Sequence, residues 1–294
     1  MTTEHPVAAD REQAVTDRVL ASFDGAADPR LREVMRSLVR HLHAFAREVR
    51  LSEAEWEGAM GFLARAGRIT DERRQEFVML SDVLGLSMLT VAVNEHGAPG
   101  ATEATVLGPF FAEDAPEVPL GGDLGRGAAG PPCFVSGQVR SLDGTPVGGA
   151  RLDVWGADAD GFYDVQYAGD RSAGRGRPAT DPDGRYRFWT VLPAAYPIPC
   201  DGPVGDLLAA AGRRPMRPAH LHFRAAAPGH RTLVTHVFVA GDPYLADDVV
   251  FGVRDSLVVD AEHHPAGPAP DGTHRPTPWT SIAFDLVLVP DDRS

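Results

Sequence analysis

The sequence predicts an α+β protein, in which an N-terminal helical domain (residues 1–110) precedes a C-terminal antiparallel β-sandwich domain (residues 111–294). Three observations predict this fold class. Apolar residues recur at helical spacing in the first hundred positions, a stretch rich in Gly, Pro and Ala follows at 112–132, and short apolar runs separated by turn sequences fill the remainder. With 294 residues, the chain is long enough for two modest domains or one large one.

Helices account for most of the first hundred residues. From Arg30 to Arg50 the apolar residues follow the i, i+3, i+4, i+7 pattern of an amphipathic helix. Ser52, with Glu55 three positions later, forms a capping-box pattern that predicts the start of a second helix. Thr70 and the charged residues after it predict the start of a third helix, whose apolar positions are Phe77, Leu80, Leu84 and Met88.

Strands are expected from about residue 133 onwards. Runs at 134–140 and 150–156 flank Leu142-Asp143-Gly144, which predicts a hairpin-type turn between them. A second turn at Asp181-Pro182-Asp183-Gly184 precedes a strand at 185–192. Further strands fit 218–225, 232–239 and 281–289, and residues 112–132 have the composition of a linker or long loop.

Composition excludes several classes of protein. The net charge of −13 argues against a nucleic-acid or anionic-membrane partner. Cys133 and Cys200 are too few for a disulfide framework, which favours a reducing compartment. The N-terminal residues resemble no signal peptide, and no apolar run reaches 18 residues, so we expect a cytoplasmic protein. No nucleophile elbow, Walker A motif or dinucleotide-binding glycine motif is present.

The segment Arg217-Pro218-Ala219-His220-Leu221-His222 is the most informative motif. On a strand, side chains alternate between faces, so His220 and His222 point the same way and can meet at one metal ion. Imidazole is a ligand for Fe, Zn, Cu or Ni. Taken alone, the motif fits two half-exposed strand histidines equally well.

Two tyrosines offer oxygen ligands for the same ion. Tyr163 follows the strand that ends in Leu152-Asp153-Val154-Trp155, and Tyr196 lies between prolines directly after another strand. A phenol ionises at neutral pH only beside a highly charged cation, and Fe(III) is a hard cation suited to anionic oxygen. Two alternatives stay open: a zinc hydrolase or lyase that uses His220, His222 and His236, and a non-catalytic binding module with the same sandwich.

Several motifs, in order and spacing, resemble the intradiol ring-cleavage dioxygenase family over nearly the whole chain. They are Thr105-Val106-Leu107-Gly108-Pro109-Phe110, Gly161-Phe162-Tyr163, Leu192-Pro193-Ala194-Ala195-Tyr196, Arg217 to His222 and Val239-Ala240-Gly241-Asp242. The hydroxyquinol-cleaving branch of the family is most similar at Leu80 to Gly85, Tyr196 to Gly205 and Asp248 to Val253. His236 replaces the glutamine usual in catechol-cleaving members, which also favours that branch.

The resemblance implies a role for each matching residue. Tyr163, Tyr196, His220 and His222 would bind one non-haem Fe(III) per chain, and Tyr196 would also take up a substrate proton. Arg217 would be catalytic, because its guanidinium would stabilise negative charge developing on the substrate ring. The substrate pocket would be lined by Met79, Asp82, Val106, Leu107, Gly108, Pro109, Phe110, Ile198, Pro199, Arg217, His236 and Val250. Of these, Asp82 could accept a hydrogen bond from a third hydroxyl, which catechol lacks.

The expected activity is cleavage of hydroxyquinol (1,2,4-trihydroxybenzene) by O2 to maleylacetate or 3-hydroxy-cis,cis-muconate, in the catabolism of aromatic compounds. Catechol or a chlorinated catechol is the alternative substrate, because single pocket residues shift selectivity by only a few kcal/mol. The resemblance also implies a homodimer joined through the N-terminal helices, with a phospholipid bound in the seam.

Overall fold

The computed structural model describes residues 6–71, 74–95, 98–167 and 173–291. The chain divides into two compact units, residues 1–64 and residues 65–294, and each is described by itself. The predicted domain boundary at residue 110 stays a prediction.

The first unit contains α1 (Pro6–Ser22), α2 (Pro29–Glu48) and most of α3 (Glu53–Ile69). Asp28 caps α2 by accepting a hydrogen bond from the Arg30 amide at 2.8 Å, and Pro29 occupies the first turn, where its missing N–H costs nothing. The predicted capping box before α3 is confirmed. The Ser52 amide donates to the Glu55 carboxylate at 2.8 Å, and the Glu55 amide donates back to the Ser52 hydroxyl at 3.3 Å.

The third predicted helix is two helices, α4 (Glu76–Val83) and α5 (Leu86–Asn94). The prediction of one continuous helix was wrong because Gly85 adopts a left-handed conformation with φ 73°, which ends α4 and bends the chain by 76° before α5. Thr70, expected at the start of this helix, instead donates its amide to the Ala66 carbonyl at the end of α3. Residues 72 and 73, also expected there, lie outside the described part of the chain.

Among the described residues, no individual helix has the length and apolarity needed to cross a membrane. Only α4 and α5 taken together meet those criteria, and the chain bends by 76° between them. The cytoplasmic location stays a prediction.

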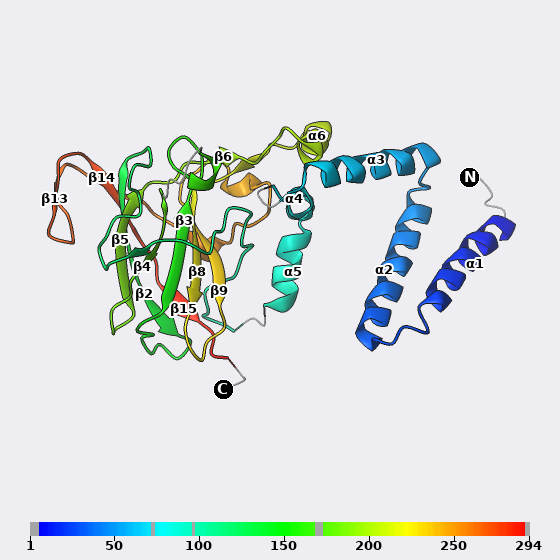
Figure 1. The fold of residues 1–294 in the computed structure, drawn as a ribbon, viewed down its shortest axis with the longest axis horizontal. Helices are drawn as coiled ribbons and strands as arrows, with labels where there is room; N and C mark the ends of the chain where they lie inside the picture. Colours follow the sequence, from blue (N-terminus) through cyan, green and yellow to red (C-terminus); the bar gives the residue numbers. More distant parts are fainter. Residues whose placement is uncertain (1–5, 72–73, 96–97, 168–172, 292–294) are drawn as a thin grey trace. The chain divides into compact units, whose positions relative to one another are not determined.

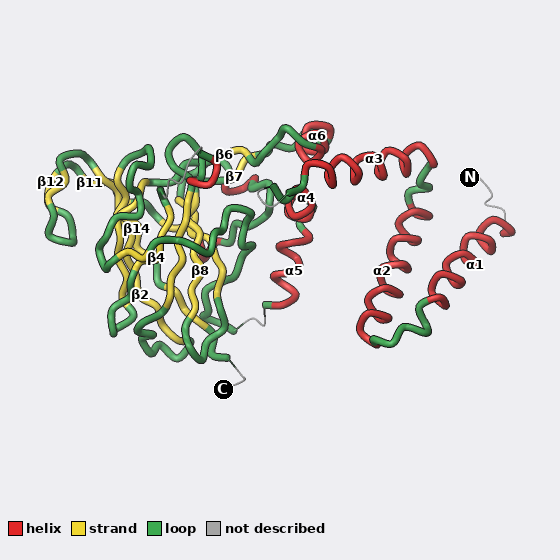
Figure 2. The backbone as a smooth tube through the Cα atoms, viewed as in Figure 1, coloured by secondary structure: helices red, strands yellow, loops and turns green. Residues whose placement is uncertain are grey.

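Two large sheets form the second unit (Figures 1 and 2). The six-stranded sheet has the order β1 (Glu117–Val118), β4 (Arg175–Pro178), β3 (Arg151–Gly156), β8 (His220–Ala226), β9 (Leu233–Val239) and β10 (Val258–Val259). The other has the order β11 (Glu262–His264), β14 (Trp279–Ala283), β2 (Pro132–Ser141) and β15 (Leu286–Leu288), with β5 (Arg185–Val191) also paired to β2.

Short elements lie between these strands. Two small ladders join β6 (Tyr196–Pro197) to β7 (Met216–Arg217) and β12 (Gly267–Pro268) to β13 (His274–Arg275). One further helix, α6 (Pro203–Ala210), and the 3-10 turns η1 (Asp164–Gln166), η2 (Leu245–Asp247) and η3 (Asp255–Leu257) complete the described elements.

The fold is α+β, as predicted. Its sheets are mixed, however, so the prediction of a purely antiparallel arrangement was wrong. The pairs β3–β8, β8–β9, β3–β4, β2–β5 and β11–β14 are antiparallel. The pairs β1–β4, β9–β10, β2–β14 and β2–β15 are parallel. The short runs and turn sequences specify where strands lie and not the direction in which distant strands pair.

Both sheets contribute to one buried core. The side chains of Val135 and Phe188 from one sheet pack in the same cluster as Leu221 and Phe223 from the other. Because strand side chains alternate, the residues between these, such as His220 and His222, face away from this core. The outer face of the six-stranded sheet is therefore the place where polar residues gather.

The predicted hairpin between residues 134–140 and 150–156 was wrong, because the two strands do not pair with each other. The turn forms, with the Gly144 amide bonded to the Ser141 carbonyl at 2.9 Å, but β2 and β3 belong to different sheets. Gly148 packs so closely on the next turn that a side chain there would lie 2.3 Å from the Pro182 carbonyl oxygen. At this point the chain leaves β2 and crosses to the six-stranded sheet.

One segment is confirmed in part and another differs from expectation. Residues 112–132, predicted to be a linker or a long loop, are mostly a long loop that contains β1, and the loop packs on the sheets: Leu124 is buried in the core and its amide donates to the Trp189 carbonyl at 2.7 Å. The single strand expected at 281–289 is two strands, β14 and β15, separated by Phe284 and Asp285. The strands at 185–192, 218–225 and 232–239 are confirmed as β5, β8 and β9.

Candidate metal centre

Two tyrosines and two histidines converge on the outer face of the six-stranded sheet. The Tyr163 hydroxyl lies 2.8 Å from Nε2 of His222, 3.3 Å from Nε2 of His220 and 3.1 Å from the Tyr196 hydroxyl. The two Nε2 atoms are 3.1 Å apart. All four side chains are buried, with exposed fractions between 0% and 5%. We refer to these four residues as the donor cluster.

The spacing of the donor cluster fits a metal ion. Two ligands each about 2.0–2.1 Å from a shared ion stand about 2.9 Å apart at a right angle and about 3.4 Å apart at a tetrahedral angle. The Tyr163 oxygen lies 2.8 and 3.3 Å from the two Nε2 atoms and 3.1 Å from the Tyr196 oxygen, which is close to this range. The donors are two imidazole nitrogens and two phenol oxygens, and the oxygens favour a hard cation.

The histidines present lone pairs to the cluster. His220 donates its Nδ1 hydrogen to the Pro218 carbonyl at 2.6 Å, which fixes the tautomer with the ring's lone pair on Nε2. Burial and the neighbouring Arg217 lower the pKa of His220 to about 3. The pKa of His222 is also far below its ordinary value, through burial and through the adjacent His236 and His220. Both rings are therefore neutral at pH 7, the form that binds a metal.

Burial lowers the pKa of the two histidines but raises that of the Tyr163 phenol. The pKa of Tyr163 is raised well above its ordinary value, first by burial and then by the neighbouring Tyr196 hydroxyl. A phenolate at this place requires a cation at bonding distance to stabilise it. The donor set and the burial together therefore suit a highly charged ion.

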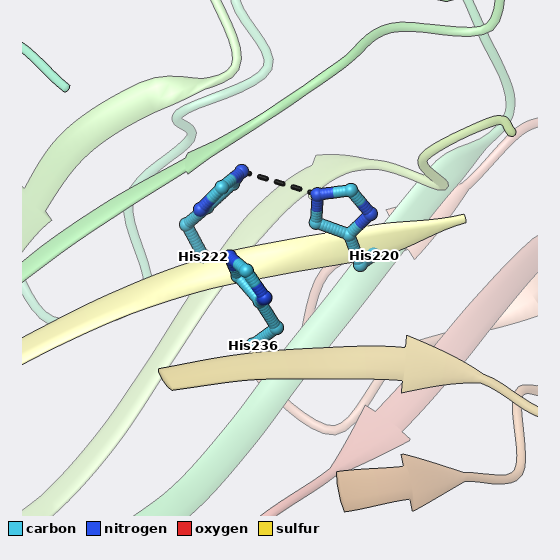
Figure 3. A group of neighbouring side chains, drawn as sticks. All are labelled: His220, His222 and His236. Atoms are coloured by element: carbon cyan, nitrogen blue, oxygen red, sulfur yellow. Dashed lines mark hydrogen bonds between the residues drawn. The ribbon is translucent and has the colours of Figure 1, made fainter. Parts of the chain in front are cut away.

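A third histidine lies beside the cluster. His236 is on β9, directly opposite His222 on β8, and the two ring centroids are 4.2 Å apart (Figure 3). One ligand atom from each of His220, His222 and His236 falls within 4.8 Å of the others. Both ring nitrogens of His236 are buried without a hydrogen-bond partner in the described structure, so the ring has donor and acceptor capacity to offer a ligand.

Aromatic packing holds the ligand rings in place. Phe110 stacks on Tyr163 with ring centroids 4.5 Å apart, and Trp155 stacks on His222 at 4.6 Å. Two glycines allow this close approach. Gly108 (φ 78°) and Gly161 (φ 80°) have left-handed backbones, and a side chain on either would lie 3.0 Å from His222 or Tyr196 respectively.

Arg217 borders the cluster and is almost fully buried, with 4% of its side chain exposed. Its Nη1 donates to Nε2 of His220 at 3.1 Å, and its Nε donates to Oδ1 of Asp248 at 3.2 Å. The β6–β7 ladder pairs Tyr196 with Arg217, which places a ligand candidate and the guanidinium on adjacent strands.

A second buried ion pair supports the wall of the site. Arg175 donates to both oxygens of Asp164 and, through Nη2, to the Phe110 carbonyl at 2.7 Å. Asp164 directly follows Tyr163. Arg175 thus ties the segment that carries Phe110 to the segment that carries Tyr163.

Besides Arg217 and His236, the predicted pocket residues come from four segments of the chain, and their common role as a pocket stays a prediction. Asp82 is buried on α4, and its carboxyl interacts electrostatically with Arg217; burial raises its pKa, opposed by a hydrogen bond with Ser87 and by Arg217. Ile198 donates its amide to the Pro215 carbonyl beside β7, and Val250 is buried two residues after Asp248. The others are Met79 on α4, Val106, Leu107 and Pro109 beside Gly108, and Pro199 after β6. Leu107 is 40% exposed.

Asp248 and Arg175 received no predicted role from the sequence. Asp248 pairs with Arg217, 31 positions away, and Arg175 pairs with Asp164, 11 positions away, and neither pairing is revealed by a local pattern. One signal was available for Asp248: a buried arginine in the Arg217 motif requires a carboxylate partner, and Asp248 directly precedes the apolar run Val249-Val250-Phe251.

Known protein families and sequences match this chain. A family model described as Dioxygenase matches residues 107–290, and one described as Catechol dioxygenase N terminus matches residues 28–102. The chain is 59% identical over 289 residues to a hydroxyquinol 1,2-dioxygenase of Nocardioides simplex, covering 97% of this chain and 99% of that one. It is 58% identical to the enzyme of the same name from Rhodococcus opacus, over 95% of this chain and 94% of that one.

Solved structures agree with these relatives. Hydroxyquinol 1,2-dioxygenase from Pseudomonas putida DLL-E4 superimposes with a TM-score of 0.90 at 44% identity, covering 96% of this chain and 100% of that one. Catechol 1,2-dioxygenase from Pseudomonas arvilla C-1 gives a TM-score of 0.82 at 29% identity, over 95% and 92%.

Proposed function

This chain belongs to the family of intradiol ring-cleavage dioxygenases, and we propose that it cleaves the ring of hydroxyquinol with O2, giving maleylacetate or 3-hydroxy-cis,cis-muconate. The observation that carries the proposal is the buried convergence of Tyr163, Tyr196, His220 and His222. The relatives named hydroxyquinol 1,2-dioxygenase support the choice of substrate.

The family implies a non-haem iron, and we assign it to the donor cluster as one Fe(III) per chain. The fit of the donor spacing, the neutral histidines and the two phenol oxygens support this assignment. When bound, the iron supplies Lewis-acid chemistry that makes the diol reactive toward O2.

The side chains at the cluster take up a substrate proton and stabilise negative charge. The Tyr196 oxygen, next to that of Tyr163, accepts a proton from a substrate hydroxyl. The Arg217 guanidinium faces the cluster through Nη1 and stabilises negative charge that develops on the ring. Because Arg217 stays protonated at any working pH, this role is electrostatic. Burial of the four donor residues excludes water, which strengthens that interaction.

Substrate selection is assigned to the predicted pocket residues, Met79, Asp82, Val106, Leu107, Gly108, Pro109, Phe110, Ile198, Pro199, Arg217, His236 and Val250. Asp82 is the residue proposed to accept the third hydroxyl of hydroxyquinol, since its carboxyl is buried on α4 and interacts with Arg217. The unpaired nitrogens of His236 offer a second polar contact. Catechol or a chlorocatechol is the alternative substrate.

A three-histidine zinc site is the more remote alternative. The grouping of His220, His222 and His236 favours it. The Tyr163 hydroxyl lies against Nε2 of His220 and of His222, with the Tyr196 hydroxyl beside it, and this favours iron instead, because a hard ion binds phenolate oxygen well.

The assembly is proposed to be a homodimer joined through the N-terminal helices, with a phospholipid in the seam. One face of α2 supports this, since its apolar residues are between 43% and 54% exposed: Leu31, Val34, Leu38, Leu42, Phe45 and Val49. A continuous apolar stripe of this kind marks an interaction surface. The two sheets around one core support a β-sandwich as the catalytic domain.

An isotope experiment tests the reaction. Iron-loaded protein is given hydroxyquinol under 18O2, and the product is analysed by mass spectrometry. Ring cleavage by a dioxygenase places oxygen from O2 in the product carboxylates. A product that carries no label, or no ring-opened product at all, would contradict the proposal.

A further inference from the structure

The carboxylate of Asp248 holds one edge of the Arg217 guanidinium. Arg217 donates from Nε to Oδ1 at 3.2 Å and from Nη2 to Oδ2 at 3.4 Å, and the two side chains are only 4% and 2% exposed. A buried guanidinium requires a counter-charge, and a buried carboxylate requires hydrogen bonds, so each group depends on the other.

Asp248 is itself fixed by backbone donors. The Gly252 amide donates to Oδ2 at 2.9 Å, and the Val250 amide contacts Oδ1 at 3.4 Å. Burial is the largest single influence and disfavours the charged carboxylate, but Arg217 together with His220 and the Gly252 amide lowers the pKa of Asp248. Gly252 also leaves room for the pair, because a methyl group there would lie 3.2 Å from both Arg217 Nη2 and Asp248 Oδ2.

The arrangement turns the opposite edge of the guanidinium toward the donor cluster. With Nε and Nη2 engaged by Asp248, Nη1 is left to reach Nε2 of His220 at 3.1 Å. A cation held by the donor cluster and the guanidinium of Arg217 would then be neighbours among buried side chains. Their repulsion is strong where water is excluded, and the nearby carboxylate offsets it.

We propose that Asp248 is a positioning residue for Arg217, which aims Nη1 at the reaction centre and offsets the charge of the guanidinium beside the metal ion. The part of this inference that concerns catalysis, the aiming of Nη1 at the reaction centre, rests on the proposed function. Asp248 acts through Arg217 and touches neither the substrate nor the donor cluster in this account.

The first test compares Asp248→Asn with Asp247→Asn in the full-length, iron-loaded protein. Asp247 is the matched control, because it is the adjacent carboxylate and its partner, Arg214, is on the surface, with side chains 51% and 61% exposed. We expect Asp248→Asn to lower kcat for hydroxyquinol at least tenfold and to speed iron loss to a chelator at least tenfold. Asp247→Asn is expected to stay within twofold of wild type in both. An Asp248→Asn protein that behaves like the control overturns the proposal.

A double-mutant cycle separates positioning from a structural role. In an Arg217→Gln background no guanidinium remains to be positioned or offset, so adding Asp248→Asn is expected to change kcat and iron loss by less than threefold. If Asp248→Asn costs the same factor in both backgrounds, it acts independently of Arg217 and the proposal fails.

Asp248→Glu keeps the test decisive if the asparagine variant does not fold. This change keeps the charge but displaces the carboxylate, so we expect iron loss within threefold of wild type and a kcat at least tenfold lower. An unchanged kcat would contradict positioning, and iron loss as fast as in a charge-removing variant would contradict charge offset. The iron comparison needs no substrate. Wild-type protein that fails to cleave hydroxyquinol would therefore refute the proposed function while the Asp248 comparison stays readable.

Discussion

The Tyr163 hydroxyl lies 2.8 Å from Nε2 of His222, although the two residues are 59 positions apart in the chain. The contact joins the loop after β3 to the outer face of β8. Among the described residues, no charged group lies at hydrogen-bonding distance from the Tyr163 hydroxyl or the His222 ring, and the arrangement that they share with Tyr196 and His220 suits a hard cation.

Replacing Tyr163 with phenylalanine is expected to abolish iron retention. The change removes one anionic oxygen while keeping the ring that stacks on Phe110. We expect iron content after chelator treatment to fall at least tenfold, with loss of the visible absorbance of an iron–phenolate centre. Tyr244→Phe, on a tyrosine packed against Arg214 away from the cluster, is the control. Full iron content and full activity in Tyr163→Phe would refute its assignment as a ligand.

Replacing Asp82 with asparagine is expected to alter substrate choice. The neutral amide oxygen of asparagine is a weaker acceptor for the third hydroxyl than the carboxylate, at a cost of about 1–3 kcal/mol, so kcat/KM for hydroxyquinol is expected to fall about 10- to 100-fold. Catechol has no such hydroxyl, and its kcat/KM is expected to change less than threefold. Steady-state kinetics with the two substrates measure this. An equal loss for both would show that Asp82 has no part in the selection.

The stability of metal-free protein is expected to decrease as pH falls below about 6.5. Burial holds the pKa of His220 at about 3 and keeps the pKa values of His222 and His236 well below their ordinary range. The unfolded chain therefore binds protons at these residues that the folded chain excludes, and stability is lost between the ordinary histidine pKa and the folded one. Each histidine adds a slope of up to about 1.4 kcal/mol per pH unit. Urea unfolding at several pH values measures the slope.

His236→Gln provides the control for this prediction. Glutamine is uncharged at every pH, so one of the three slopes is removed, and the pH dependence is expected to weaken by up to about 1.4 kcal/mol per pH unit. A free energy of unfolding that does not vary between pH 7.5 and pH 5.5 would contradict the neutral, buried state of the three rings.

The exposed face of α2 is expected to form the subunit contact. Leu38, 47% exposed, lies in the apolar stripe, whereas Arg40 is an exposed polar residue of the same helix. Leu38→Glu is expected to shift the protein from the mass of two chains to that of one, as measured by light scattering after size exclusion. Arg40→Glu places the same charge on the polar side and is expected to leave the mass unchanged. A Leu38→Glu protein that keeps the wild-type mass would show that the stripe is not the interface.

Local patterns predicted the elements on which the site depends. The alternation in His220-Leu221-His222 predicted two rings on one face, and β8 has that arrangement, with Leu221 in the core between the sheets. The capping box at Ser52 and the turn at Asp181–Gly184 also depend on residues close in sequence, which explains why both could be identified.

Long-range relationships could not be identified in the same way. The turn at Leu142–Gly144 signals a bend, but it does not specify that β2 pairs with β5 and leaves β3 to the other sheet. Likewise, the pair between Arg217 and Asp248 depends on β7 and the segment after η2, which meet only in the folded chain. The assignments of individual ligand and pocket residues stay proposals.

Oxygen uptake by purified, iron-loaded protein, with hydroxyquinol and catechol measured side by side, tests the central claim most directly. An enzyme-free blank corrects for autoxidation of hydroxyquinol. We expect uptake with hydroxyquinol to be at least tenfold faster than with catechol. Faster uptake with catechol would keep the ring-cleavage chemistry and refute the roles given to Asp82 and His236. No uptake with either substrate, from protein shown to contain iron, would contradict the proposed function itself.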